Sequence, residues 1–129
     1  METVETLIIG AGQAGLTMSH ALSKRGRPHL VLERGRIAER WQSERWDGLH
    51  FQTPNALVRL PDFPFLSSNP DGYATGAEIA AYLDAYAAFI RAPVRTGVSV
   101  TVLRRGFVAE TSEGEFRANN VVVATGPFQ

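Results

Sequence analysis

The feature that most constrains this chain is a series of glycines directly after a short apolar run near the N-terminus. Residues 7–9 (Leu-Ile-Ile) are apolar and partly β-branched, as in a buried strand. Gly10, Gly12 and Gly15 then give the spacing G-x-G-x-x-G, and residues 13–24 favour helix. The sequence therefore predicts a strand, a tight turn and a helix in direct succession.

Each glycine has its own physical reason. Gly10 permits the tight turn out of the strand, Gly12 lets a ligand approach the backbone, and Gly15 lets the helix pack closely on the sheet. The helix N-terminus offers free N–H groups to phosphates. A second apolar run, 29–32, ends at Glu33, whose carboxylate can accept hydrogen bonds from two ribose hydroxyls. Together these features predict a dinucleotide site, and a glycine turn without a nucleotide is the alternative.

Composition limits the class of protein. The 129 residues fit one domain, residues 1–129, and 44% of them are hydrophobic, enough for a core. Thirteen basic and thirteen acidic residues balance, which gives no reason to expect nucleic acid or a membrane surface as partner. The chain has no cysteine, so it supplies no redox-active disulfide. No apolar segment approaches a membrane span, and we expect a cytoplasmic protein.

Histidines give no sign of a metal site. His20, His29 and His50 are scattered without the spacing of metal ligands. His20 falls within the predicted first helix, where we expect a partly buried structural residue. We predict no metal and find no catalytic acid, base or nucleophile that would act without a cofactor.

The segment 34–54 mixes charges with large aromatic side chains and keeps no clean period. Trp41 and Trp46 stand in it, and a loop with this much aromatic surface commonly covers something. One interpretation is that the tryptophans cover a cofactor. The other is that they cap the edge of the core. Composition alone favours neither.

The middle of the chain reads as a loop and then a helix. Residues 60–73 contain three prolines and a glycine and predict a loop. Thr75 followed by Glu78 makes a capping box, and apolar residues at helical spacing continue until Pro93. A short strand is expected at 94–96. The apolar stripe of the helix is typical of a core face.

The last third of the chain predicts strands. Alternating residues from Val98 onward, with a hairpin turn at Glu113-Gly114, predict an antiparallel meander of three short strands. Residues 121–123 are a continuous valine run, as expected for a separate strand buried on both faces of a parallel sheet. The expected fold class is therefore α/β and Rossmann-like, with about four parallel strands, helices on one face and the meander on the other.

Several stretches together resemble one known family. GAGQAG, LVLER, RWQSERWDGLHFQTP, the helix EIAAYLDAYAAF and the closing VVVATGPF are similar to the N-terminal FAD-binding segment of flavin-dependent monooxygenase-like oxidoreductases. That group includes flavin-containing monooxygenases, Baeyer–Villiger enzymes and plant auxin-forming enzymes. The resemblance covers nearly the whole chain.

The resemblance implies a set of FAD contacts. It places the pyrophosphate on the glycine turn and the adenosine ribose on Glu33, with Arg34 flanking the adenine. Val100 would read the adenine edge, with Val98 as a near alternative. The full set is Gly10, Ala11, Gly12, Gln13, Ala14, Gly15, Glu33, Arg34, Arg40, Trp41, Gln52, Thr53, Val100, Thr125 and Gly126.

The sequence departs from the family in two ways. The family commonly has two glycines before the loop tryptophan, whereas this chain has Glu39 and Arg40, and Arg40 would supply charge to the phosphates. Relatives also continue well past this length, with a second glycine-rich motif for NADPH. We therefore expect a partial FAD-binding domain that does not turn over NADPH alone and is prone to self-association.

The resemblance implies a function for the full-length family. NADPH would reduce the flavin, and the reduced flavin would activate dioxygen for transfer to a small-molecule substrate. Two alternatives remain from the residues themselves. One is a nicotinamide-dependent dehydrogenase domain, and the other is a non-catalytic FAD-binding or dinucleotide-binding module.

Overall fold

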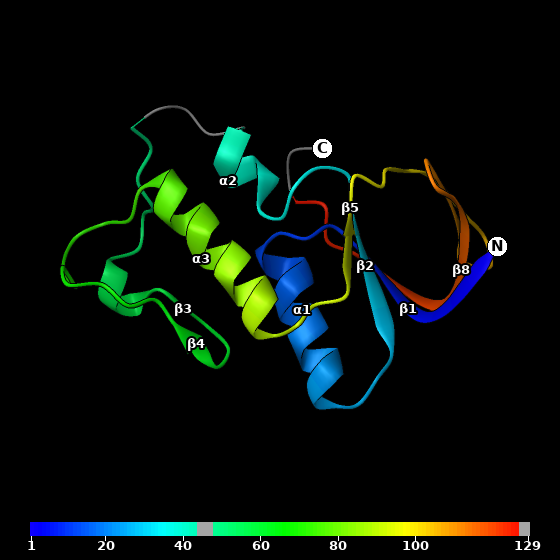
Figure 1. The fold of residues 1–129 in the computed structure, drawn as a ribbon, viewed down its shortest axis with the longest axis horizontal. Coiled ribbons are helices and arrows are strands. Elements are labelled where there is room, and N and C mark those ends of the chain that lie inside the picture. The colour runs from blue at the N-terminus through cyan, green and yellow to red at the C-terminus, as the bar shows by residue number, and fades with distance from the viewer. Residues whose placement is uncertain (44–47, 127–129) are drawn as a thin grey trace.

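The chain folds into one curved sheet with helices against it (Figure 1). The computed structural model describes residues 1–43 and 48–126. Strands are β1 (Glu2–Ile9), β2 (His29–Glu33), β3 (Arg59–Leu60), β4 (Phe63–Pro64), β5 (Val94–Thr96), β6 (Val100–Arg104), β7 (Val108–Thr111) and β8 (Gly114–Val123). Helices are α1 (Gln13–Lys24), α2 (Glu39–Ser43) and α3 (Gly76–Phe89), with a 3-10 turn at Asn55–Leu57.

The main sheet has six strands in the order β5-β2-β1-β8-β7-β6. β1 pairs in parallel with both β2 and β8, and β2 pairs in parallel with β5. β7 and β6 then extend the sheet in antiparallel fashion. The expected four parallel strands and the meander are thus both present, within one hydrogen-bonded sheet.

The two faces of the parallel strands are covered by different layers. Ile8 and Val31 point into a core with residues of α1 and α3, such as Leu16 and Leu83. Their neighbours in β1 and β2, which point the opposite way, join a second core with residues of the meander. This second core comprises Leu7, Leu30, Leu32, Val98, Ala109, Phe116 and Ala118. The expected arrangement, helices on one face and the meander on the other, is confirmed.

The prediction of two separate strands at the end of the chain was wrong. The returning strand of the meander and the valine run form one strand of 10 residues, β8. Parallel pairing with β1, such as Val4 with Ala118 and Thr6 with Asn120, keeps β8 continuous across the polar residues in its middle. The expectation of burial on both faces also fails at the end of β8, because Val123 is 64% exposed.

The segment expected to be loop contains a small hairpin, β3–β4, that two tyrosines of α3 hold in place. The Tyr82 hydroxyl accepts a hydrogen bond from Leu60 N at 2.8 Å and donates to Phe63 O. Tyr86 donates from its hydroxyl to Pro61 O at 3.1 Å. The hairpin was missed because side chains on a distant helix stabilise it, and its own two-residue strands carry no pattern.

Helix boundaries follow the sequence signals. α1 begins and ends as predicted, and Gly26 follows it with φ +66°. The capping box at α3 is confirmed, since Thr75 Oγ1 accepts from Glu78 N at 3.1 Å and Glu78 Oε1 accepts from Thr75 N at 3.0 Å. His20 is mostly buried and bonds Asp62 Oδ2 through Nε2 at 2.8 Å. No helix in the described ranges is long and apolar enough to cross a bilayer.

Candidate functional site

The first glycine of the motif lies where the ends of three parallel strands meet. Gly10 has φ +111°, a conformation that favours glycine, and its N–H donates to Leu32 O at 2.8 Å. A Cβ at this position would lie 2.2 Å from Ala124 O, at the end of β8. Gly10 therefore lets β1 turn between the ends of β2 and β8.

Gly15 and Gly12 differ in how closely other atoms approach them. A Cβ on Gly15 would lie 1.8 Å from Gly10 O, so only glycine lets α1 pack this closely on the turn. A Cβ on Gly12 would have no atom within 4 Å. The absence of a side chain at Gly12 is thus not required by the fold, and it leaves the backbone at the start of α1 approachable.

Glu33 ends β2 beside this turn. Its Oε1 accepts a hydrogen bond from Ala11 N at 2.9 Å, and its Oε2 accepts from Gly35 N at 2.7 Å. The carboxylate therefore connects the glycine turn with the chain that leaves β2. Gly35 is itself crowded, because a Cβ there would lie 2.8 Å from Glu39 Cγ.

A cavity of about 770 Å³ lies over the carboxyl ends of the parallel strands. In an α/β sheet this edge, where the strand order reverses, is the usual location for a ligand. The predicted residues that line the cavity are Gly10, Ala11, Gly12, Gln13, Ala14, Glu33, Arg34, Arg40, Trp41, Val100, Thr125 and Gly126. Their assignment to a cofactor stays a prediction, but they form one continuous lining.

Three predicted residues are not part of this lining. Gly15 lies beneath the turn, where it packs on Gly10. Gln52 and Thr53 follow a segment that is held against the start of α3, where Phe51 N donates to Ala74 O at 2.7 Å. The structure therefore does not bring Gln52 and Thr53 together with the other candidates, and their assignment as FAD contacts stays a prediction.

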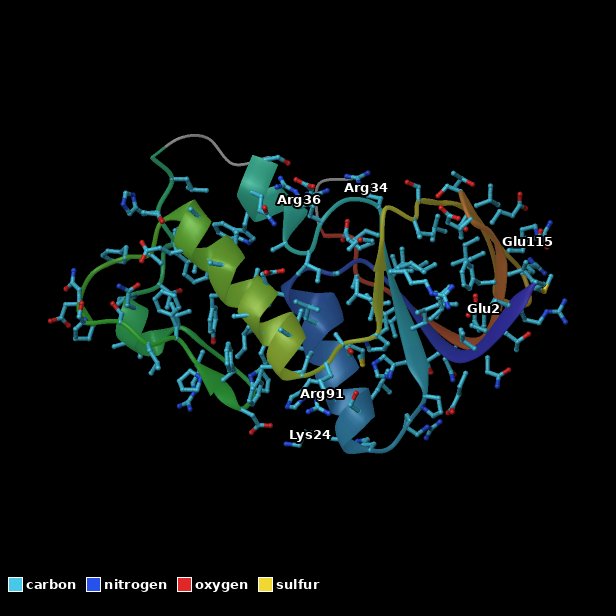
Figure 2. The ribbon with its side chains drawn as sticks, viewed as in Figure 1. Glu2, Lys24, Arg34, Arg36, Arg91 and Glu115 are labelled. Atoms are coloured by element: carbon cyan, nitrogen blue, oxygen red, sulfur yellow. The ribbon has the colours of Figure 1, made fainter. Side chains whose placement is uncertain are left out.

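Arg40 and Gly126 approach each other across the cavity mouth. Both line the cavity, and the guanidinium Cζ of Arg40 is 3.7 Å from the position that a Cβ on Gly126 would take. Arg40 thus places its charge beside the end of β8. Arg34 lies where the chain passes from β2 toward α2 (Figure 2).

Trp41 is placed both to cap the edge of the core and to cover a ligand in the cavity. It packs against the helix-side core, with its ring centroid 5.6 Å from that of Phe51. It also lines the cavity. Trp46 lies outside the described residues.

The cavity also contains residues that the sequence did not single out, among them Ala38, Ser99 and Ala124. Ala38 adopts φ +58° and donates its N–H to Ala11 O at 3.2 Å, which brings the start of α2 over the glycine turn. No sequence pattern indicates a left-handed alanine. Ser99 could have been inferred, since it stands between Val98 and Val100.

Val98 and Val100, the two candidates for contact with the adenine, differ in their backbone environment. Val98 is buried and already donates its N–H to Glu33 O at 3.0 Å. Val100 begins β6 and pairs with Thr111, where the register shifts before Val102. Both valines line the cavity, and the amide N–H of Val98 is already used within the chain.

A strand, a glycine turn, a helix and an acidic residue at the next strand end define a dinucleotide-binding α/β unit. Comparison with known proteins identifies the family to which this unit belongs. The chain belongs to the family described as pyridine nucleotide-disulphide oxidoreductase, which it matches over residues 7–129.

Individual relatives support the resemblance seen in the sequence. An uncharacterized CzcO-like oxidoreductase of Geobacillus kaustophilus is 38% identical over 98% of this chain and 37% of its own length. A probable indole-3-pyruvate monooxygenase, YUCCA1 of Arabidopsis thaliana, is 37% identical over 93% of this chain and 30% of its own length. The chain thus spans about a third of these curated relatives.

A solved structure agrees with them. The flavin-containing monooxygenase from Stenotrophomonas maltophilia superposes with a TM-score of 0.80 and 28% identity, over 98% of this chain and 39% of that protein. The predicted resemblance to flavin-dependent monooxygenase-like oxidoreductases is therefore confirmed.

Proposed function

We propose that this chain is the FAD-binding portion of a flavin-dependent monooxygenase-like oxidoreductase. The observation that carries the proposal is the single cavity in which the glycine turn, Glu33, Arg40 and the end of β8 meet. Relatives named as monooxygenases match the same stretch of chain. When bound, FAD would supply the redox chemistry, and the protein would supply binding and orientation.

The residues of the cavity fit a dinucleotide. The open space at Gly12 and the start of α1 offer an uncrowded backbone and unpaired N–H groups to a pyrophosphate. Arg40 would add positive charge from the opposite side, next to Gly126. Glu33 would accept hydrogen bonds from the adenosine ribose, and Val100 would face the adenine edge.

Glu33 also supports FAD over NADP as the occupant. A carboxylate at the ribose repels a 2′-phosphate, which NADP carries and FAD lacks. Arg34, which lines the same cavity, would offset part of that repulsion. NADPH would instead reduce the flavin from a second dinucleotide site, which we expect in the part of the relatives' length that this chain does not span.

The substrate would be a small organic molecule that receives an oxygen atom, and the protein would act in the cytoplasm. The two other candidates are a nicotinamide-dependent dehydrogenase and a binding module without catalysis. This chain carries no cysteine for the disulfide chemistry in the family's name.

Binding preference tests the proposal directly. FAD and NADP⁺ are titrated separately into the chain, with flavin fluorescence reporting FAD and displacement of FAD reporting NADP⁺. We expect FAD to saturate one site and NADP⁺ to displace it only at much higher concentration. Tighter binding of NAD⁺ or NADP⁺ than of FAD would instead support the dehydrogenase.

A further inference from the structure

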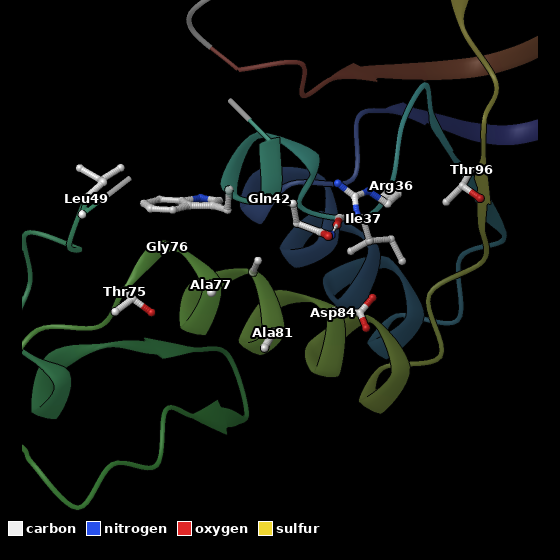
Figure 3. Close-up of a pocket in the computed structure, with 13 residues that line it drawn as sticks. Arg36, Ile37, Gln42, Leu49, Thr75, Gly76, Ala77, Ala81, Asp84 and Thr96 are labelled. Carbon is white, nitrogen blue, oxygen red and sulfur yellow. Dashed lines mark hydrogen bonds between the residues drawn. The ribbon is translucent and has the colours of Figure 1, made fainter. Parts of the chain in front are cut away.

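A second cavity, of about 810 Å³, lies between α2 and α3 (Figure 3). Its volume falls within the range typical of sites for small organic molecules, roughly 300–1,000 Å³. Among the described residues, Trp41 is the one that lines both this cavity and the dinucleotide cavity. The two spaces therefore share an aromatic wall.

The walls of this second cavity differ from one end to the other. Gly76, Ala77 and Ala81 of α3 form a floor of small residues, which leaves room above the helix. Leu49 lies toward one end, whereas Arg36 and Asp84 lie toward the other (Figure 3). A ligand would thus meet small and apolar side chains together with polar groups, and both charged side chains at one end.

The charge at that end is not balanced. Arg36 already donates from Nε to Glu39 Oε1 at 3.1 Å and from Nη2 to Glu39 Oε2 at 2.9 Å. The Asp84 carboxylate has no hydrogen bond or ion pair with another residue in the described ranges. The positive group is therefore already paired within the chain, and the negative group has room for a cation.

We propose that this second cavity binds a small organic cation, with an aromatic or aliphatic body and an ammonium group. The body lies on the alanine floor of α3 against Trp41, and the ammonium pairs with Asp84. Thr96 and Gln42 add polar groups to the lining. This site goes beyond the dinucleotide site, and it does not depend on which dinucleotide binds there.

Phenethylammonium chloride is a suitable probe because it has one aromatic ring and one cationic end. It is titrated into ¹⁵N-labelled chain while backbone amide shifts are followed. We expect saturable changes confined to α2 and to residues 76–84 of α3, including Ala77 and Asp84, with a dissociation constant on the order of millimolar. Hydrocinnamate, which has a carboxylate in place of the ammonium, should bind much more weakly.

Two variants test the assigned contacts. Asp84→Asn keeps the shape and removes the charge, and the loss of an exposed ion pair should weaken binding about threefold. Ala81→Leu fills the floor and should weaken binding by more than that. Asp71→Asn is the matched control, because Asp71 is an exposed aspartate that lines neither cavity.

The comparison of cation with anion uses the unaltered chain, so it holds even if a variant folds poorly. Equal binding of phenethylammonium and hydrocinnamate would overturn the proposal. So would shifts spread over the whole molecule, or an unchanged affinity in folded Asp84→Asn.

Discussion

Glu33 accepts a hydrogen bond from the backbone N–H of Ala11, with 2.9 Å between Oε1 and N. This bond joins the end of β2 to the glycine turn after β1. The second oxygen, Oε2, accepts a hydrogen bond from Gly35 N at 2.7 Å. Glu33 therefore holds the shape of the turn in addition to its proposed contact with a ribose.

Removal of the Glu33 side chain should affect both stability and binding. Glu33→Ala leaves two partly buried N–H groups without their partner, which should lower the free energy of unfolding by about 1–3 kcal/mol. Loss of the charged acceptor should weaken FAD binding by roughly tenfold or more. Urea unfolding and FAD titration measure the two effects.

Glu113→Ala is the control for that experiment, since Glu113 is an exposed glutamate in the turn between β7 and β8. It should change neither quantity. If Glu33→Ala bound FAD as tightly as the unaltered chain, the ribose assignment would be wrong.

Gly12→Ala should separate binding from folding. The new methyl group meets no atom within 4 Å, and the backbone at Gly12, with φ −92° and ψ −161°, suits alanine. The unfolding free energy should stay the same within about 0.5 kcal/mol. Because the methyl group stands where a pyrophosphate would approach, FAD affinity should fall. Unchanged FAD affinity in this variant would remove the turn from the proposed site.

Gly15→Ala should show the opposite pattern. Its methyl group would lie 1.8 Å from Gly10 O, and the helix must move to avoid it. Overpacking of this kind costs about 1–3 kcal/mol, measured as a lower midpoint of urea unfolding. A variant as stable as the unaltered chain would show that α1 is less tightly fixed on the turn than the structure indicates.

The parts of the fold that were predictable rest on local rules. The glycine spacing, the capping box of Thr75 and Glu78, and the apolar runs of β1 and β2 each have a physical cause within a few residues. These features predicted the parallel sheet, both long helices and the edge at which the dinucleotide cavity lies.

The remainder depends on contacts between distant segments. The continuity of β8 depends on its pairing with β1, and the β3–β4 hairpin depends on Tyr82 and Tyr86. The approach of Arg40 to Gly126 likewise joins residues far apart in sequence. Such contacts leave no periodic pattern, and so the sequence alone did not reveal them.

Trp41 should report the occupant of the dinucleotide cavity, because its side chain lines that cavity. Bound FAD should quench tryptophan emission by energy transfer, and the quench should be reduced in Trp41→Phe. Steady-state fluorescence during FAD titration measures this. A full quench in Trp41→Phe would assign the effect to Trp46 and leave Trp41 as a residue of the core edge.

The start of α2 should be sensitive to acid. Hydrogen bonds from the Arg36 side chain and from Ser43 lower the pKa of Glu39 from 4.5 to about 2. A lowered pKa means that the stabilisation is complete above about pH 4.5 and is lost as the pH falls toward 2. Glu39→Gln should therefore be less stable than the unaltered chain near neutral pH, and the difference should vanish near pH 2. A constant difference across that range, in urea unfolding, would contradict the assignment.

We propose that the cavity over the glycine turn holds FAD by its ADP half. Competition between ligands tests it most directly: FAD-loaded chain is titrated with ADP and, separately, with FMN, while the release of FAD is followed by fluorescence. ADP carries the ribose and pyrophosphate that Glu33 and the glycine turn would contact, and FMN carries only the flavin half. We expect ADP to displace FAD and FMN to leave it bound. Displacement by FMN without displacement by ADP would contradict it.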